Sequence, residues 1–183
     1  MAIKQVVICG DPRLRVPSDE VTAFGEDNLG ELHQHLLDSQ QAYDGAGLAA
    51  PQIGIQKRVM LIGFDRCKRY PDRKPIEKTL LINPSYEKLT DEMDYAWEGC
   101  LSVPNMRGVV ARYKAIRYKG FDLNGEKIER EVDGFHARLV QHECDHLDGI
   151  IYIDKLLDIQ LFGFCDVLDY SALDRYLADK GLK

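Results

Sequence analysis

The feature that constrains this chain most is the pattern H-E-x-x-H, which occupies residues 142 to 146. On a helix, residues four apart share one face, so His142 and His146 can bind one divalent metal ion with Glu143 beside it. This arrangement is typical of a hydrolytic metal site, where the carboxylate moves a proton of water. The alternative is an ordinary amphipathic helix that carries solvated histidines.

A catalytic metal site needs a third protein ligand. Residues 147 to 183 contain no Glu and no His, so the downstream ligand of the common zinc peptidases is absent. Cys100, in the segment E-G-C-L-S-V-P, is the best candidate for the missing ligand. In a zinc endopeptidase, Asp154 or Asp158 would take its place instead.

A third segment, G-A-G-L-A-A-P-Q at residues 45 to 52, consists of small residues and ends in an amide side chain. A backbone with so little side-chain bulk can pass close to a substrate, and Gln52 can donate a hydrogen bond. Alone, such a segment could equally be a tight turn. A non-catalytic metal-binding or ribosome-docking module would need neither Glu143 nor Gln52.

Taken together and in this order, the three segments resemble the peptide deformylase family, whose motifs look like G-x-G-x-A-A-x-Q, E-G-C-L-S and Q-H-E-x-D-H. The similarity also covers the opening residues 10 to 15 and the arm 103 to 110, so it extends from about residue 3 to about residue 160. The resemblance implies a metal-dependent hydrolase that removes the N-formyl group from the N-terminal methionine of newly synthesised polypeptides and releases formate.

The resemblance also implies roles for individual residues. It assigns the metal to Cys100, His142 and His146, and general acid/base chemistry to Glu143. It further implies an oxyanion hole made by the Gln52 side chain and the Leu101 backbone N–H. A residue next to a metal ligand is held rigidly against the reacting carbonyl, which suits Leu101 for this task.

Substrate contacts are expected from small and apolar residues near the ligands, namely Ala46, Gly47, Phe135 and Leu139. One thiolate and two imidazoles suit Zn²⁺, and they also accommodate Fe²⁺, Co²⁺ or Ni²⁺. The resemblance points to one Fe²⁺ per chain as the working ion.

The hydrophobic pattern predicts an α+β fold with antiparallel sheets packed around the H-E-x-x-H helix. We expect an N-terminal helix at about 28–44 and a variable C-terminal helix at about 163–180. The expected strands are 58–64, 79–82, 109–121, 126–132 and 150–153, and residues 1–10 also look like a strand. All of this fits one catalytic domain, 1–183.

Composition narrows the class of protein further. The net charge of -6 argues against general nucleic-acid binding, and no DNA partner is expected. Neither an apolar run of eighteen residues nor a charged-then-apolar leader is present, so we expect no membrane span and no secretory signal. Five cysteines do not suggest a disulfide framework. These features favour a cytoplasmic monomer.

Two further interpretations concern charged residues. The basic run Arg66, Lys68, Arg69, Arg73 and Lys74 predicts an exposed loop, with a transient contact to ribosomal RNA as the more specific hypothesis. Glu98 precedes the proposed cysteine ligand and is expected to pair with Arg112 or Arg107. Such a pair matters only if it is buried.

Overall fold

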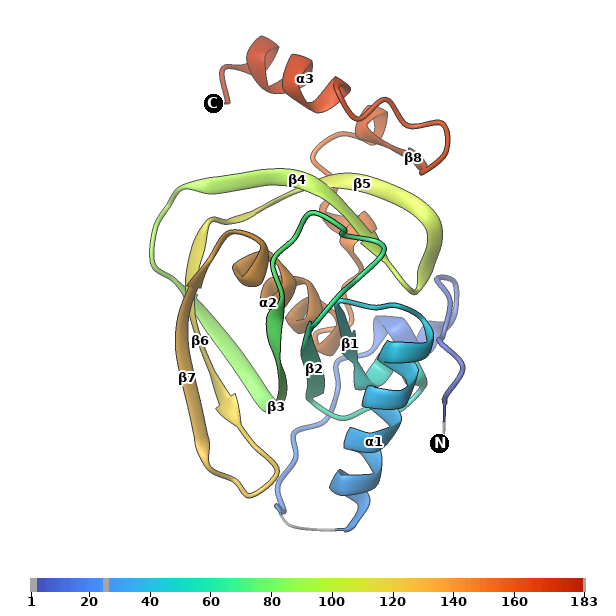
Figure 1. Ribbon diagram of the computed structural model, residues 1–183, viewed down its shortest axis with the longest axis vertical. Coiled ribbons are helices and arrows are strands. Elements are labelled where there is room, and N and C mark those ends of the chain that lie inside the picture. The colour runs from blue at the N-terminus through green and yellow to red at the C-terminus, as the bar shows by residue number, and fades with distance from the viewer. Residues whose placement is uncertain (1–2, 25–26, 183) are drawn as a thin grey trace.

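Helix α2 (Gly134–Leu147) is enclosed by two antiparallel sheets in the computed structural model, which describes residues 3–24 and 27–182 (Figure 1). The larger sheet has the strand order β1 (Gly47–Ala49), β2 (Val59–Phe64), β3 (Ile76–Lys88), β6 (Ala115–Phe121) and β7 (Lys127–Asp133). The smaller sheet has the order β4 (Met93–Cys100), β5 (Val103–Tyr113) and β8 (Phe162–Phe164). The predicted α+β class with antiparallel sheets is confirmed.

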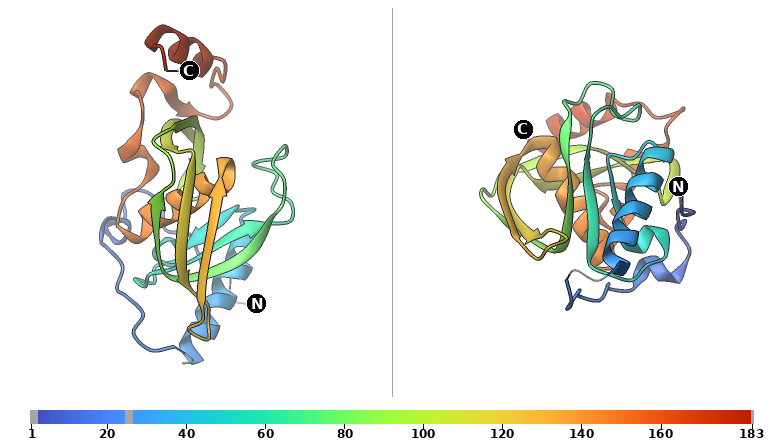
Figure 2. Two further views of the ribbon diagram at one scale, coloured as in Figure 1. Left: turned by 90° about the vertical axis from the view of Figure 1, so that its left-hand side faces the viewer. Right: turned by 60° about the horizontal axis from the view of Figure 1, so that its bottom comes forward.

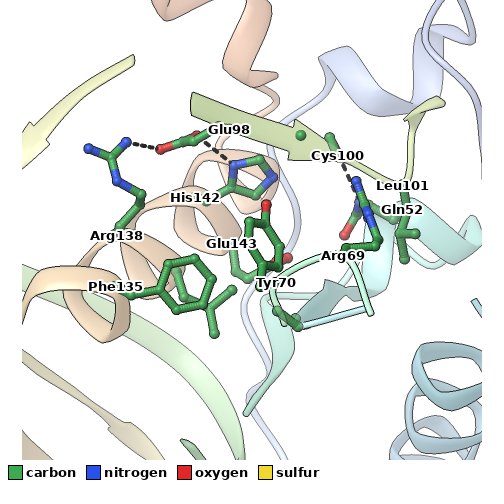
Figure 3. A pocket seen from close by; sticks show the side chains of 14 residues that line it. Gln52, Arg69, Tyr70, Glu98, Cys100, Leu101, Phe135, Arg138, His142 and Glu143 are labelled. Carbon is green, nitrogen blue, oxygen red and sulfur yellow. Dashed lines mark hydrogen bonds and ion pairs between the residues drawn. The ribbon is translucent and has the colours of Figure 1, made fainter. Parts of the chain in front are cut away.

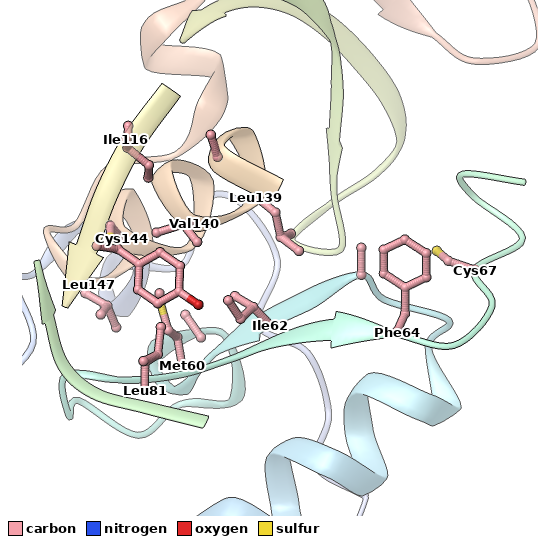
Figure 4. Packing of buried hydrophobic residues seen from close by; sticks show 14 residues of the cluster. Met60, Ile62, Phe64, Cys67, Leu81, Ile116, Leu139, Val140, Cys144 and Leu147 are labelled. Atoms are coloured by element: carbon pink, nitrogen blue, oxygen red, sulfur yellow. The ribbon is translucent and has the colours of Figure 1, made fainter. Parts of the chain in front are cut away.

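The main core lies between α2 and the larger sheet. Ala137, Val140, Cys144 and Leu147 recur on one side of α2, and all four are buried. They pack against apolar side chains of β2, β3 and β6, among them Met60, Ile62, Leu81, Ile116 and Tyr118 (Figure 4). Cys144, which lies between the two histidines in the sequence, therefore belongs to the core.

Strand β2 is buried on both faces, and its side chains divide between two layers. Met60 and Ile62 face the core beside α2, whereas Val59 and Leu61 face helix α1 (Asp27–Ala42). Leu29, Leu32 and Leu36 recur at helical spacing on α1 and cover that second face. The expected N-terminal helix is thus present, and it fixes β1 and β2 from the outside.

The predicted strand 109–121 is wrong as one element. Strand β5 ends at Tyr113 and β6 begins at Ala115, and the two strands belong to different sheets. At the break, Lys114 donates its N–H to Glu92 O at 2.9 Å and accepts from Gly134 N at 2.9 Å. Neither Gly nor Pro stands at this position. The chain changes sheet here because β5 and β6 pair with strands of different sheets.

Two shorter strand predictions are also wrong. The second half of the predicted strand 150–153 belongs to the 3₁₀ helix η3 (Tyr152–Lys155), where the Asp154 carboxylate accepts from Ile151 N at 2.9 Å. Residues 3–10 contain no strand; isolated hydrogen bonds attach them to the body instead, such as Val7 N to Gln52 O at 2.8 Å. Residues 1 and 2 lie outside the described part of the chain.

The C-terminal segment differs from the helix predicted at about 163–180. It begins with β8, where Phe164 pairs with Met106 of β5, and only then forms helix α3 (Ala172–Lys180). Leu173 of α3 belongs to a small apolar cluster that includes Trp97 of β4. Figures 1 and 2 place this segment beyond the β4–β5 hairpin, at the opposite end of the molecule from α1. Among the described residues, no helix is both long and apolar enough to cross a membrane.

Candidate active site

A pocket opens where the end of β4, the strand β1 and the first turns of α2 meet (Figure 3). All four residues expected to contact substrate line it: Ala46, Gly47, Phe135 and Leu139. The same pocket is lined by Cys100, His142, Glu143, Gln52 and Leu101. The fold therefore brings together residues from three distant segments of the sequence.

Cys100, His142 and His146 form a cluster whose ligand atoms all lie within 4.8 Å of one another. All three residues are buried, and Cys100 Sγ lies 3.2 Å from His146 Nε2. Burial alone would raise the pKa of the Cys100 thiol, but the two histidines hold that pKa well below its ordinary value. A thiolate and two imidazoles at this separation fit a first-row divalent ion.

The position of Cys100 is set by the turn between β4 and β5. The pairing shifts register between Glu98 and Cys100, and Cys100 then pairs with Val103 across the turn. Inside this turn, Ser102 N donates to Cys100 Sγ at 3.4 Å. The cysteine therefore sits at a strand end that is fixed by the hairpin and directed toward α2.

A buried ion-pair network, which we name the Glu98 network, holds the His142 ring. Glu98 Oε2 accepts from His142 Nδ1 at 2.8 Å, which leaves His142 Nε2 free to face the cluster. Arg112 donates to both Glu98 oxygens at 2.9 Å, and Arg138 Nη1 donates to Oε1 at 2.6 Å. Asp145 completes the network through Arg112 Nη1.

The charge of Glu98 follows from its partners. Burial would raise the pKa of this carboxyl, but Arg112 and His142 hold the pKa well below its usual range. The expected pairing of Glu98 with Arg112 is confirmed and is buried, with both side chains at most 4% exposed. Arg107, the alternative partner, instead donates to Arg69 O at 2.7 Å.

Glu143 lies in the pocket with its Oε2 atom unpartnered among the described residues. Burial raises the pKa of this carboxyl to about 7, against the opposing effect of the two histidines. The space beside Glu143 admits only a glycine at position 47 without a shift, since a Cβ built there would lie only 2.4 Å from Glu143 Oε1. The carboxylate is thus held against a bare stretch of backbone and can accept or release a proton near neutral pH.

Gln52 is oriented by its own backbone neighbourhood in the 3₁₀ helix η2 (Ala50–Ile53). Ala49 N donates to Gln52 Oε1 at 2.8 Å, which fixes the amide so that Nε2 is the atom facing the cluster. This nitrogen lies 3.3 Å from Cys100 Sγ and 3.3 Å from Ser102 Oγ. A hydrogen-bond donor therefore points to the same place as the ligands, beside Leu101.

Sequence reasoning missed three residues that line the pocket: Arg69, Tyr70 and Arg138. The Tyr70 ring lies 4.8 Å from the ring of Phe135, between centroids. Arg69 had been counted in an exposed basic run, and the structure corrects this: the other four residues of the run are exposed, but Arg69 is half-buried at the pocket. No sequence signal distinguishes these three residues, and the burial of Arg138 within the motif helix is seen only in the structure.

The downstream aspartates lie elsewhere. Asp154 pairs with Arg15, and Asp158 accepts from Gln160 N at 2.9 Å within its own turn. Neither belongs to the ligand cluster found among the described residues. The endopeptidase alternative thus lacks its third ligand.

Comparisons with known proteins agree with this geometry. Residues 3–161 match the family described as polypeptide deformylase. Peptide deformylase 1 of Nitrosomonas europaea is 49% identical over 166 residues, which cover 91% of this chain and 94% of that protein. Peptide deformylase 2 of Ralstonia nicotianae is likewise 49% identical over the same shares of the two chains.

Solved structures give the same result. The class I type b peptide deformylase from Acinetobacter baumannii, with Met-Ala-Ser bound, superposes with a TM-score of 0.81 at 34% identity and covers 85% of this chain and 100% of its own. The peptide deformylase from Thermotoga maritima superposes with a TM-score of 0.76 at 34% identity, over 86% of this chain and 100% of its own. This chain belongs to the polypeptide deformylase family.

Proposed function

We propose that this protein hydrolyses the N-terminal formamide of newly synthesised polypeptides that begin with formyl-methionine, releasing formate and a free amine. The observation that carries the proposal is the ligand cluster of Cys100, His142 and His146 with the unpartnered Glu143 carboxylate beside it. Membership of the deformylase family supports the choice of substrate.

We propose Cys100, His142 and His146 as the ligands of one divalent ion. When bound, the ion supplies Lewis-acid chemistry, because it polarises a carbonyl oxygen and lowers the pKa of water toward about 7. Fe²⁺ is the proposed working ion, and Zn²⁺, Ni²⁺ and Co²⁺ fit the same donors. The Glu98 network supports the assignment, since it fixes the proton of His142 on Nδ1.

Glu143 is the proposed general base and general acid. Its unpartnered Oε2 can take a proton from the attacking water and then give it to the departing amine nitrogen. A pKa of about 7 suits both steps, because the group can exist in either protonation state at neutral pH.

Gln52 and Leu101 are the proposed oxyanion donors. The amide Nε2 of Gln52 points into the pocket because Oε1 is held by Ala49 N. The Leu101 backbone N–H follows directly after the ligand Cys100, so its position is fixed by the β4–β5 turn. Such preorganised donors stabilise the negative charge that develops on the formyl oxygen.

The first side chain of the substrate is proposed to lie against Ala46, Gly47, Phe135 and Leu139. Methionine suits this lining because it is flexible and apolar. We further propose a cytoplasmic monomer made of one catalytic domain, in which the segment after residue 161 is a variable addition. A transient ribosome contact through the exposed residues Arg66, Lys68, Arg73 and Lys74 is part of the same proposal.

The decisive experiment measures formate release from a formyl-Met-Ala-Ser peptide by protein purified without oxygen and loaded with Fe²⁺. Glu143→Ala is the matched variant, and metal content is measured on both samples. We expect the variant to keep its metal and to lose roughly 100- to 10,000-fold in kcat, the usual contribution of a general acid/base.

Two results would contradict the proposal. If iron-loaded, folded protein releases no formate, the proposed deformylase activity is wrong. If Glu143→Ala keeps full activity, the proposed acid/base role of this carboxylate is wrong. Cleavage of internal peptide bonds in place of formate release would favour the endopeptidase alternative.

A further inference from the structure

A groove adjoins the pocket and continues from it. It encloses about 570 Å³ and shares three residues with the pocket: Arg69, Cys100 and Leu101. This volume lies within the 300–1,000 Å³ of ordinary ligand sites. A peptide whose first residue occupies the pocket therefore has space for its next residues here. We name this space the arginine groove.

Three distant parts of the chain form its walls. Residues 5, 6 and 8 contribute one wall, and residues 104–107 at the start of β5 contribute the second. Cys165 and Tyr170 of the C-terminal segment contribute the third. Cys165 N donates to Asn105 O at 2.8 Å, which attaches the C-terminal wall to β5.

The charge of the arginine groove is opposite to that of the molecule. Its lining contains Arg69 and Arg107 but no Asp and no Glu, although the whole chain carries a net charge of -6. Within residues 3–24 and 27–182, neither arginine has an ion-pair partner within 4.0 Å. This differs from Arg112 and Arg138, which both contact carboxylates.

Arg107 is nevertheless held in place, and the Arg69 side chain lies close to it. Arg107 donates to Arg69 O at 2.7 Å, and its guanidinium lies 5.1 Å from the centre of the Tyr70 ring. A Cβ built on Gly99 would lie 3.0 Å from Arg69 Nη2 and 3.3 Å from Arg107 Cγ. The two side chains thus lie over the backbone that precedes Cys100, as Figure 3 shows for Arg69.

We propose that Arg69 gives the arginine groove a preference for a carboxylate side chain at the second or third residue of the peptide. A half-buried cation without a carboxylate partner, in a groove whose lining contains no acidic residue, favours an anionic ligand. This inference rests on the proposed deformylase function, because it uses the same pocket for the first residue.

The test compares three formylated peptides at each of the two positions. Formyl-Met-Ala-X-Ala and formyl-Met-X-Ala-Ala carry Glu, Gln or Lys at X, and every C-terminus is amidated so that X holds the only carboxylate. We expect kcat/KM for Glu to exceed that for Gln by about fivefold at one of the positions, with Lys lower than both. The difference should shrink as the salt concentration rises.

The matched variants are Arg69→Gln and Lys68→Gln, which remove the same charge from adjacent residues. Lys68 is exposed and does not line the groove, so its variant should keep the ratio of Glu to Gln peptides. Arg69→Gln should bring that ratio close to one. Calorimetric binding of the unformylated product Met-Ala-Glu-Ala amide, compared with its Gln analogue, gives a second readout that does not depend on turnover.

The outcomes separate this inference from the proposed function. Turnover of all peptides with equal kcat/KM for Glu and Gln would overturn the carboxylate preference and leave the deformylase activity in place. A preference that survives in Arg69→Gln would overturn the assignment to Arg69. If no peptide releases formate, both the proposed function and this inference fail.

Discussion

The Glu98 network and the arginine groove both adjoin Cys100, yet they use charge in opposite ways. In the network, Glu98 and Arg112 are 3% and 2% exposed, and each cation contacts at least one carboxylate. In the groove, Arg69 and Arg107 have no carboxylate within ion-pair distance among the described residues. Paired charges hold a ligand in place, whereas unpaired charges remain available to a molecule that arrives from outside.

The largest effect should follow from Cys100→Ala, which removes the only thiolate from the proposed ligand set. We expect the variant to lose its metal during dialysis and to release no measurable formate, because an uncharged methyl group offers nothing to the ion. Metal analysis by mass spectrometry and the formate assay check this result. Cys9→Ala, outside the ligand cluster, is the control, and metal retained in Cys100→Ala would show that another residue is the third ligand.

Glu98→Ala tests the paired region. It leaves Arg112 with Asp145 and Arg138 with Asp94, so we expect a loss of unfolding free energy near the lower end of the usual range for a broken buried pair, about 3 kcal/mol. Metal affinity should fall roughly 10- to 100-fold, because His142 Nδ1 loses its acceptor. Chemical denaturation and metal titration measure the two effects.

The control for that variant is Glu92→Ala, which removes an exposed carboxylate paired with Lys114. It should leave both the denaturation midpoint and the metal affinity unchanged. Equal losses of stability and of metal affinity in the two variants would show that the buried pairs of Glu98 contribute no more than the exposed pair of Glu92. The contrast between the Glu98 network and the arginine groove would then be wrong.

Gln52→Ala should lower kcat roughly 100- to 1000-fold while the metal content stays the same, since one proposed oxyanion donor is removed and all three proposed metal ligands remain. The control is Gln56→Ala, because this half-buried amide donates to Arg13 O and does not line the pocket. If the Gln52 variant loses metal in proportion to its activity, the role of Gln52 is to support the Cys100 thiolate through the contact of Nε2 with Sγ, and the oxyanion role is wrong.

Leu173→Ala should have the smallest effect on chemistry. The side chain packs in the small cluster that fixes α3 against β4, so we expect about 2 kcal/mol less protection of the α3 amides in hydrogen exchange. The value of kcat for formyl-Met-Ala-Ser should not change, since Leu173 lines neither the pocket nor the arginine groove. A large loss of kcat would show that the C-terminal segment supports the ligands as well as the groove wall.

The ligand cluster could be predicted from the sequence because its members lie in short contiguous motifs. The spacing of His142 and His146 alone places them on one face of a helix. The small residues around Gly47 indicate a backbone that approaches another group closely. The lack of a downstream ligand made Cys100 the best candidate for the third ligand, and the resemblance to a family then implied the oxyanion roles of Gln52 and Leu101. In the structure all of these residues except His146 line one pocket, and His146 joins Cys100 and His142 in the cluster beside it.

The features that escaped prediction depend on partners far away in the sequence. Arg69 and Tyr70 lie in a loop without periodicity, so nothing local distinguishes them from solvated neighbours. The break at Lys114 contains no glycine or proline, and its position is set by which strands pair with β5 and β6. Strand β8 has only three residues and exists because β5 offers it a free edge.

The proposed ligands are divided between β4 and α2, and this division determines when the metal site can form during synthesis and folding. Cys100 and His146 are 46 positions apart, and both elements must be packed before their donor atoms meet. The growing chain cannot offer this set of donors until α2 has been synthesised. A bound metal ion connects the β4–β5 hairpin to helix α2. Removing the ion with a chelator should therefore lower the melting temperature of the protein, although no covalent bond of the chain is broken.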